Sequence, residues 1–158
     1  MTTPDPVEGG CACGAVRYRL ESEPLFVNCC HCSWCQRESG GAFALNAMIE
    51  TDRVTVLRGN PATVLTPSAS GKGQKIVRCP ECKVAVWSHY SGDFISFVRV
   101  GTLDRAAEFP PDIHIFVSTR QPWVVLPPGA KACADFYDPR TAWPPQSLAR
   151  WKAARDKA

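Results

Sequence analysis

Closely spaced cysteines are the residues of this chain with the clearest potential for chemistry. Two pairs lie far apart in the sequence, Cys11 and Cys13 in C-A-C-G and Cys79 and Cys82 in C-P-E-C. Four thiolates from two such pairs can enclose one zinc ion in a tetrahedron, because each pair can turn both side chains inward from a tight knuckle. We therefore predict a closed, structural zinc site on these four cysteines. Buried free thiols or a C-x-x-C redox pair are the alternatives.

A second group of cysteines lies between these pairs, in the stretch C-C-H-C-S-W-C at 29–35. Within it, Cys30, Cys32 and Cys35 form a C-x-C-x-x-C motif, which can place three sulfurs on a second zinc ion. A zinc ion with three protein ligands keeps one position free, and such an open position is typical of catalytic sites. The sequence therefore predicts a closed metal site that supports the fold and an open one that reacts.

Two alternatives for this second group remain. Cys29, His31 or Cys133 could supply a fourth ligand and make the site structural as well. Cys32 and Cys35 could instead form a redox pair of the thioredoxin type. Such a pair usually occurs in a βαβ unit, which this sequence does not indicate, so we favour the open metal site.

Short strands separated by turns must position these cysteines. Alternating or β-branched segments predict strands at 16–20, 42–49, 53–57, 62–66, 84–90, 94–100, 113–117 and 123–126. Glycine and proline clusters separate these segments, as expected of turns. The predicted fold is therefore mainly β, built from short antiparallel strands. Each cysteine pair directly precedes a strand, so a shared metal ion would join strands that are distant in the sequence.

Helices are expected in two places. A short helical turn follows Cys35 and ends before Gly40. A second helix follows Pro145, with Ser147 as its N-cap. The many prolines between Pro110 and Pro145 leave little room for another helix in that region.

The length of the chain is that of a single domain. We expect a flexible N-terminus over residues 1–8, a zinc-binding domain over 9–145 and a basic C-terminal helix or tail over 146–158. The formal charge of +3 comes from the last twelve residues, in which four basic residues outweigh one acidic residue. The remainder carries no net charge, which disfavours nucleic acid as a partner.

The N-terminus lacks the basic and apolar regions of a signal peptide, and no apolar run is long enough to span a bilayer. We therefore expect a cytoplasmic protein with no membrane partner. The cysteine count of nine is odd, and the cytosol keeps thiols reduced, so metal ligation is favoured over disulfides. The sequence leaves the oligomeric state open.

Several of these segments together resemble one known family. They are, in order, C-A-C-G-A-V-R-Y, N-C-C-H-C-S-W-C-Q-R-E-S-G-G-A-F, R-C-P-E-C, G-T-L-D, H-I-F and Q-P-W, and they run from Gly9 to Trp123. Each segment alone is a weak signal, but the ordered set is specific. It resembles the glutathione-dependent formaldehyde-activating enzyme family, to which centromere protein V is related.

The resemblance implies a β-tent fold that is stabilised by a structural zinc ion on the two cysteine pairs. It also implies a second zinc ion on the C-x-C-x-x-C motif, which the family associates with catalysis, and thus two ions per chain. The implied activity is that of a carbon-sulfur lyase, which joins glutathione and formaldehyde into S-hydroxymethylglutathione or reverses that reaction. Two residues depart from the family pattern: Lys83 stands where glycine often follows the second pair, and Cys29 adds a thiol beside the ligands.

A zinc ion with three thiolate ligands could bind an incoming thiol, lower its pKa and hold it near a carbonyl group. Three thiolates also make the metal a weaker Lewis acid than neutral histidines would, so thiol delivery is the more natural role. Because glutathione carries two carboxylates, cations should line its site. Arg37 is the first candidate substrate contact, followed by Arg99 and Arg17, whereas we expect His89 and His114 to be hydrogen-bonded structural groups.

A non-catalytic zinc module that binds a protein or a nucleic acid is the alternative function. An enzyme should have an accessible three-cysteine metal, whereas a scaffold should have a closed site and a charged surface patch. The neutral body of the chain favours the enzyme, and the basic tail is the best argument for the scaffold.

Overall fold

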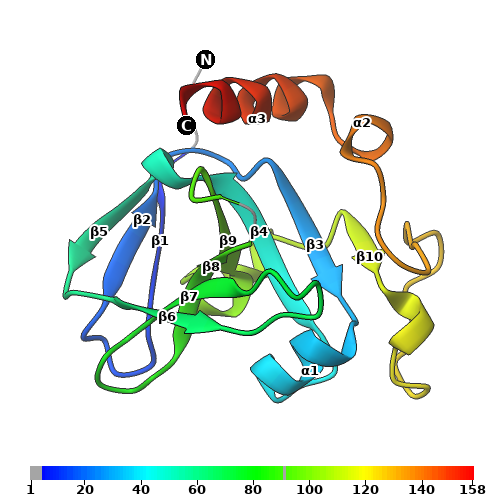
Figure 1. Ribbon diagram of the computed structural model, residues 1–158, viewed down its shortest axis with the longest axis horizontal. Helices are drawn as coiled ribbons and strands as arrows, with labels where there is room; N and C mark the ends of the chain where they lie inside the picture. Colours follow the sequence, from blue (N-terminus) through cyan, green and yellow to red (C-terminus); the bar gives the residue numbers. More distant parts are fainter. Residues whose placement is uncertain (1–4, 91) are drawn as a thin grey trace.

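Ten strands in two sheets form the framework of the protein, for which a computed structural model describes residues 5–90 and 92–158. The strands are β1 Val7–Gly10, β2 Arg17–Leu20, β3 Phe26–Cys30, β4 Ala44–Glu50, β5 Val54–Arg58, β6 Ala62–Thr66, β7 Gln74–Arg78, β8 Ala85–His89, β9 Ile95–Arg99 and β10 Ile113–Ile115. The small sheet has the order β1-β2-β5, and the large one β10-β3-β4-β9-β8-β7-β6 (Figure 1). The predicted mainly β fold is confirmed, although β10 pairs in parallel with β3.

Three α-helices accompany the sheets. They are α1 Ser33–Ser39, α2 Pro139–Ala142 and α3 Pro145–Lys157, and four 3-10 turns lie at Thr51–Arg53, Val100–Thr102, Ala106–Glu108 and Val117–Thr119. The helix α1 ends at Gly40 as predicted, where a φ of 68° is left-handed, but it begins at Ser33, before Cys35. The C-terminal helix is also confirmed, but Ser147 is not its N-cap, because the helix already begins at Pro145. The four-residue α2 lies in the proline-rich stretch where no helix was expected, and its proline stands at the first helical position, where proline is tolerated.

The strand predicted over 123–126 is wrong. Pro122 and Pro127 flank this segment, and proline cannot donate a backbone hydrogen bond to a neighbouring strand. Trp123 and Val125 are 71% and 87% exposed, so the apolar residues there do not face a core. No strand was predicted at β1, β3 or β7. All five residues of β3 are buried, so this strand lacks the alternation that identifies a strand with one face exposed.

The main core lies between the inner faces of the two sheets. The fully buried residues there include Val16, Tyr18, Leu20, Ile49, Val86 and Val98. The ring of Tyr18 packs edge-on against Trp87 at 5.3 Å, and its hydroxyl lies 2.6 Å from Thr102 Oγ1. A Cβ atom at Gly9 would come within 2.7 Å of that hydroxyl, so only glycine fits this position. The G-T-L-D segment therefore ties the small sheet to the end of β9.

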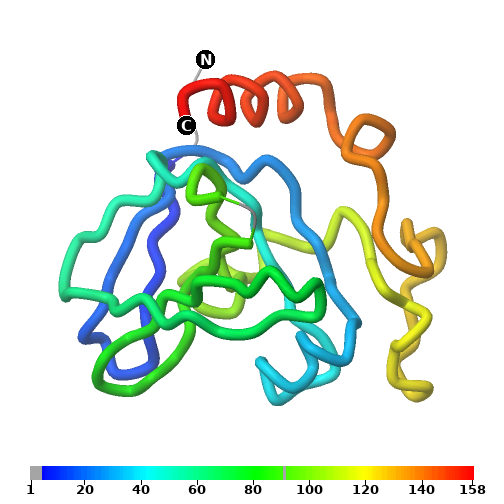
Figure 2. Tube along the Cα trace, in the orientation of Figure 1, coloured from blue at the N-terminus to red at the C-terminus, as the bar shows by residue number. Residues whose placement is uncertain are grey.

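The outer face of the large sheet carries a second apolar cluster. In β4, Ala47 and Ile49 belong to the core between the sheets, whereas Ala44 and Met48 belong to the outer cluster, as the two-residue period of a strand requires. The C-terminal segment passes β10 and then crosses, as α3, the end of the sheet where β3 begins and β4 ends (Figure 2). One apolar face of the sheet thus supports the fold, and the other is available for a site.

Hydrogen bonds hold the C-terminal segment against β3. The indole Nε1 of Trp143 donates to the Tyr137 hydroxyl at 2.8 Å, and that hydroxyl donates to Asn28 Oδ1 at 2.8 Å. Ser147 Oγ donates to the Leu25 carbonyl at 2.6 Å, which explains why this serine is buried inside the helix rather than at its cap.

The ends of the chain were expected to form separate segments. Residues 1–4 lie outside the described residues, while Val7 and Glu8 belong to β1. The division of the chain into 1–8, 9–145 and 146–158 stays a prediction. None of the helices in the described part of the chain is long and apolar enough to cross a membrane.

An ion pair joins α3 to the end of β4. Arg150 donates two hydrogen bonds to the Glu50 carboxylate, at 2.8 and 2.6 Å, and the Glu50 side chain is only 5% exposed. Burial alone would raise the pKa of Glu50, but the hydrogen bonds and the charges of Arg150 and Arg53 outweigh burial and lower it. The carboxylate is therefore ionised at neutral pH and depends on Arg150.

We predict that Arg150→Ala lowers the free energy of unfolding by about 1–3 kcal/mol, because it leaves a nearly buried carboxylate without its main partner. Lys152→Ala, an exposed change on the same helix, should cost less than about 0.5 kcal/mol. Because the pKa of Glu50 is lowered by folding, the stabilisation is present at neutral pH and disappears as the pH falls through the carboxylate range. Urea denaturation at several pH values measures both effects, and equal losses in the two variants would contradict the assignment.

Candidate metal centres

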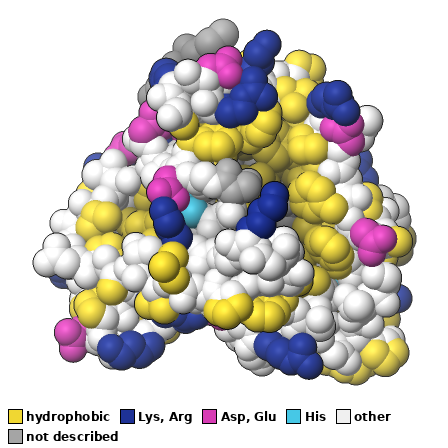
Figure 3. Space-filling model, viewed as in Figure 1, with side chains coloured by type: hydrophobic (Ala, Val, Ile, Leu, Met, Phe, Trp, Pro, Cys, Tyr) yellow, Lys and Arg dark blue, Asp and Glu magenta, His cyan; other side chains and the backbone are white. Residues whose placement is uncertain are grey.

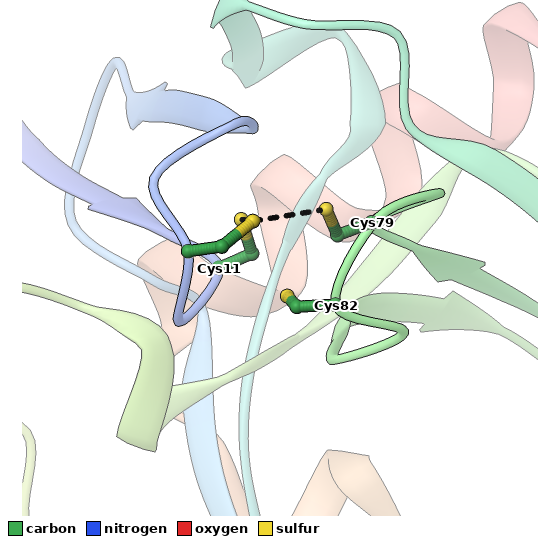
Figure 4. A group of neighbouring side chains, drawn as sticks. Cys11, Cys79 and Cys82 are labelled. Atoms are coloured by element: carbon green, nitrogen blue, oxygen red, sulfur yellow. Dashed lines mark hydrogen bonds between the residues drawn. The ribbon is translucent and has the colours of Figure 1, made fainter.

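The two distant cysteine pairs meet between the sheets. Cys11 and Cys13 lie in the loop from β1 to β2, and Cys79 and Cys82 lie in the loop from β7 to β8. Their four sulfur atoms all lie within 4.8 Å of one another, with Sγ separations of 3.6 Å between Cys11 and Cys13 and 3.8 Å between Cys13 and Cys79. Figure 4 shows the side chains from the two loops pointing toward a common centre.

These separations fit a tetrahedral metal site. With zinc-sulfur bonds of about 2.3 Å, adjacent sulfurs of a tetrahedron lie about 3.8 Å apart, and the observed distances are far too long for a disulfide bond. The backbone N–H of Val84 lowers the pKa of Cys82 to about 6. The Cys13 sulfur also has a backbone N–H partner, at Ala15, yet the thiol of Cys11 helps to raise its pKa to about 11. The four cysteines could therefore hold a metal ion.

The second knuckle contains a residue in an unfavourable backbone conformation. Lys83 follows Cys82 with a φ of 65°, in the left-handed region that glycine adopts most easily. Its backbone N–H donates to the Cys79 carbonyl at 3.0 Å, closing the turn that presents both sulfurs. Glycine would adopt this conformation at lower cost than the lysine that the chain has here.

The C-x-C-x-x-C motif brings its three sulfurs together at the start of α1. Cys30 ends β3, Cys32 is the N-cap of α1, and Cys35 lies in the first turn of the helix. The backbone N–H of Cys35 donates to Cys32 Sγ at 3.3 Å. Contacts from the thiols of Cys30 and Cys35, together with backbone N–H groups including that of Trp34, lower the pKa of Cys32. The neighbouring thiols of Cys30 and Cys32 raise the pKa of Cys35.

Among residues 5–90 and 92–158, this group has no fourth Cys, His, Asp or Glu ligand within 4.8 Å of all three sulfurs. Cys29 and His31, the neighbours considered as a fourth ligand, instead belong to a separate buried group with His114. Cys133 packs against the apolar cluster on the outer face of the large sheet, but its sulfur does not belong to the three-cysteine group. The three-cysteine group could thus hold a metal ion with one position left for another ligand.

The separate buried group was not anticipated from the sequence. His31 Nε2 lies 3.0 Å from His114 Nδ1 and 3.6 Å from Cys29 Sγ. Burial lowers the pKa of both histidines and raises that of Cys29 to about 12, so all three groups are neutral. His114 is therefore a hydrogen-bonded group beneath the three-cysteine loop. Its partner His31 is 83 residues away in the sequence.

Two cavities adjoin the three-cysteine group and share Trp34, Cys35 and Tyr90 in their walls. The first, of about 310 Å³, is here called the polar cavity, because Glu38, Gln74, Arg78 and Arg99 line it. The second, of about 300 Å³, is called the apolar cavity. All three cysteines line it together with Phe97, Phe116, Phe136, Ile115, Ala69, Asn28, Asn46, Ser68 and Ser70.

The arginines proposed from the sequence occupy different places. Arg37 is exposed on α1 and lines neither cavity, so its role as a substrate contact stays a prediction. Arg17 pairs with Asp104 and connects β2 to the G-T-L-D segment. Arg99 lines the polar cavity and donates to Asn46 Oδ1 at the border of the apolar cavity. His89 Nδ1 lies 3.0 Å from the Ile95 carbonyl, in hydrogen-bond contact.

Several residues around Cys35 were not predicted from the sequence. Gln74, Arg78 and Tyr90 lie on or next to β7 and β8, and no motif marks them. Gln74 is 4% exposed, and neither its Nε2 nor its Oε1 has a hydrogen-bond partner in the described part of the chain. Unpartnered buried amide groups are costly, so this side chain is notable at the edge of a cavity.

The chain is similar to one protein family over most of its length. The sequence model of the glutathione-dependent formaldehyde-activating enzyme family matches residues 6–119. The chain belongs to this family. A curated relative from Halomonas elongata, provisionally named a glutathione-dependent formaldehyde-activating enzyme, is 27% identical over 155 residues, covering 93% of this chain and 94% of its own. A crystal structure of a Rhodobacter sphaeroides protein is 26% identical, covers 62% of this chain and 88% of its own, and has a TM-score of 0.48.

We predict that Lys83→Gly raises the free energy of unfolding by about 0.5–1 kcal/mol, because glycine relieves the left-handed conformation in the knuckle. Lys83→Ala is the matched control, since it removes the same side chain but keeps a Cβ atom at this position. Thermal or urea unfolding of the two variants measures the difference. A glycine variant no more stable than the alanine variant would show that backbone strain is absent.

Proposed function

We propose that the protein is a zinc-dependent carbon-sulfur lyase that makes or breaks the bond between the sulfur of a glutathione-type thiol and an aldehyde carbon. In this proposal each chain binds two zinc ions. A structural ion is held by Cys11, Cys13, Cys79 and Cys82, and a catalytic ion by Cys30, Cys32 and Cys35. Membership of the family and the name of the Halomonas relative support the substrate class.

The contrast between the two cysteine groups is the observation that carries the proposal. The four-cysteine group contains as many sulfurs as a tetrahedral zinc site needs, whereas the other group contains three sulfurs and borders two cavities. A ligand-sized space beside an incomplete ligand set favours an enzyme over a purely structural zinc module. When bound, a zinc ion with three thiolates supplies a position at which a substrate thiol can lose its proton.

Neighbouring side chains can assist at the substrate oxygen. Arg99 donates to Asn46 Oδ1, which leaves the Nδ2 group of that amide as a donor. Burial raises the pKa of Tyr90, so its hydroxyl stays protonated and can also donate. We infer that Asn46 and Tyr90 orient the carbonyl oxygen and stabilise the negative charge that develops on it as the carbon-sulfur bond forms.

The alternative, a module that binds a partner through the basic tail, has less support. Arg150 of the tail is engaged with Glu50, and Arg155 pairs with Asp156 and packs over the Trp151 ring. The tail is therefore partly occupied with contacts inside the protein.

We predict that the purified protein contains two zinc ions per chain and that Cys32→Ser contains one while remaining folded. Elemental analysis gives the stoichiometry, and calorimetric titration with glutathione tests whether the variant still binds the thiol. Cys133→Ser, outside both groups, is the matched control and should keep two ions and the response to glutathione. Two ions in Cys32→Ser, or no response to glutathione in the wild type, would refute the open site.

For the four-cysteine group, we expect Cys79→Ser to abolish the cooperative unfolding transition at room temperature, because the free energy of metal binding is then lost from folding. Circular dichroism during urea denaturation measures the transition, and Cys32→Ser should retain it. A Cys79→Ser variant as stable as Cys133→Ser would show that this group does not hold a structural metal.

A further inference from the structure

We propose that the aldehyde partner of this enzyme is larger than formaldehyde and carries an apolar group, which occupies the apolar cavity while the polar cavity holds the peptide part of the thiol. This inference rests on the proposed function and narrows its substrate class. The two cavities meet at Cys35, so a thiol and an aldehyde could reach the three-cysteine group from different sides.

The apolar cavity is unsuited to glutathione itself. None of the residues described in its wall is charged, and the rings of Phe97, Phe116 and Phe136 form much of its surface. Glutathione has two carboxylates and an ammonium group, and each would lose its hydration there without gaining an ionic partner. An aromatic or alkyl group would instead be stabilised by burial against these rings.

The size of the apolar cavity also exceeds what formaldehyde requires. At about 300 Å³ it reaches the range typical of ligand pockets, whereas formaldehyde contributes one carbon and one oxygen. A neighbouring cavity of about 180 Å³ below α3 shares Phe97 and Phe136 with it and is lined further by Met48, Trp143 and Trp151. Figure 3 shows hydrophobic side chains in a band on this face, from beneath α3 along the β10 side. The apolar space thus extends away from the cysteines.

The polar cavity has the groups that the thiol would need. Arg99 and Arg78 line it, and Arg78 also pairs with Glu38. The amide of Gln74, buried without partners among the described residues, can both donate to and accept from a peptide group. The amide groups of a glutathione-type thiol would therefore complete the hydrogen bonds that Gln74 leaves open, and its carboxylates would lie near the two arginines.

The arrangement fits a balanced addition. The thiol sulfur bonds to the aldehyde carbon, the carbonyl π bond breaks, and the carbonyl oxygen takes up the proton released by the thiol. No oxidant or reductant is needed. Asn46 lies in the wall of the apolar cavity, where its Nδ2 group can donate to that oxygen. The reverse reaction returns the thiol and the aldehyde.

Part of the apolar wall comes from beyond the family match. The match covers residues 6–119, whereas Phe136 and Trp143 belong to the segment that follows. This segment is attached to β3 through Tyr137 and Asn28. The apolar group would therefore be recognised by a part of the chain separate from the cysteine loops, which allows the aldehyde to differ while the metal ligands stay the same.

Stable thioethers that imitate the glutathione adducts of a larger apolar aldehyde and of formaldehyde test the proposal. We expect the zinc-loaded protein to bind S-benzylglutathione about 10- to 100-fold more tightly than S-methylglutathione, because the benzyl ring is buried in the apolar cavity. Isothermal titration calorimetry measures both affinities without requiring turnover. Equal affinities, or tighter binding of S-methylglutathione, would overturn the inference and leave the proposed function intact. If neither conjugate binds, the proposed function fails and this inference fails with it.

Two variants test whether the apolar cavity binds the benzyl ring. Phe136→Ala should reduce the preference for the benzyl conjugate about 3- to 10-fold and leave S-methylglutathione binding unchanged. Trp123→Ala, which removes an exposed aromatic residue that lines neither cavity, is the control and should alter neither affinity. An equal loss for both conjugates in Phe136→Ala, or a lost preference in Trp123→Ala, would overturn the assignment of the apolar cavity.

Gln74→Leu should weaken both conjugates about 5- to 20-fold, since it removes the amide that would bind the peptide part. The same change should not lower the free energy of unfolding, because it replaces a buried amide that has no partner among the described residues. A merely structural glutamine would show the opposite result, with unchanged affinities and lower stability, and that outcome would remove the polar cavity from the proposal.

Discussion

The close approach of four thiols from two loops is the interaction on which the rest of the structure depends. One pair belongs to the small sheet and the other to the large sheet, so their meeting joins the two sheets at one end. Four thiols at this distance cannot all ionise without a cation, because thiolates repel one another. The raised pKa of Cys13 beside the lowered pKa of Cys82 reflects that conflict, and a metal ion would resolve it. The apolar core between the sheets stabilises the same contact between them.

The large sheet uses its two faces differently, and adjacent residues of one strand illustrate the division. In β3, Cys29 contacts the buried histidines, whereas Cys30 belongs to the three-cysteine group on the outer face. In β4, Ala47 fills the core, whereas Asn46 lines the apolar cavity. Because strand side chains alternate, the same strands that build a rigid core also fix the walls of the cavities. The site therefore gains its rigidity from the core behind it.

Most of the fold could be predicted from residue patterns, and the failures have physical causes. β3 was missed because both of its faces are buried, which removes alternation from its sequence. The segment 123–126 has strand-forming residues, but flanking prolines and exposure leave it without a partner. Ser147 has a residue type common at helix caps, yet its hydroxyl binds the Leu25 carbonyl, a contact across 122 residues that no local pattern contains.

The sequence by itself determined the three-cysteine group and each of the two cysteine pairs, because a spacing of two or three residues keeps side chains close whatever the rest of the chain does. Cys30, Cys32 and Cys35 are near one another for this reason. The meeting of the two pairs across 66 residues depends on the tertiary structure. Only the tertiary structure decided what surrounds the three-cysteine group. The register of β4 with β9 places Asn46 opposite Arg99, and β7 and the end of β8 bring Gln74 and Tyr90 beside Cys35. These neighbours depend on strand order across long sequence separations, which local spacing does not encode.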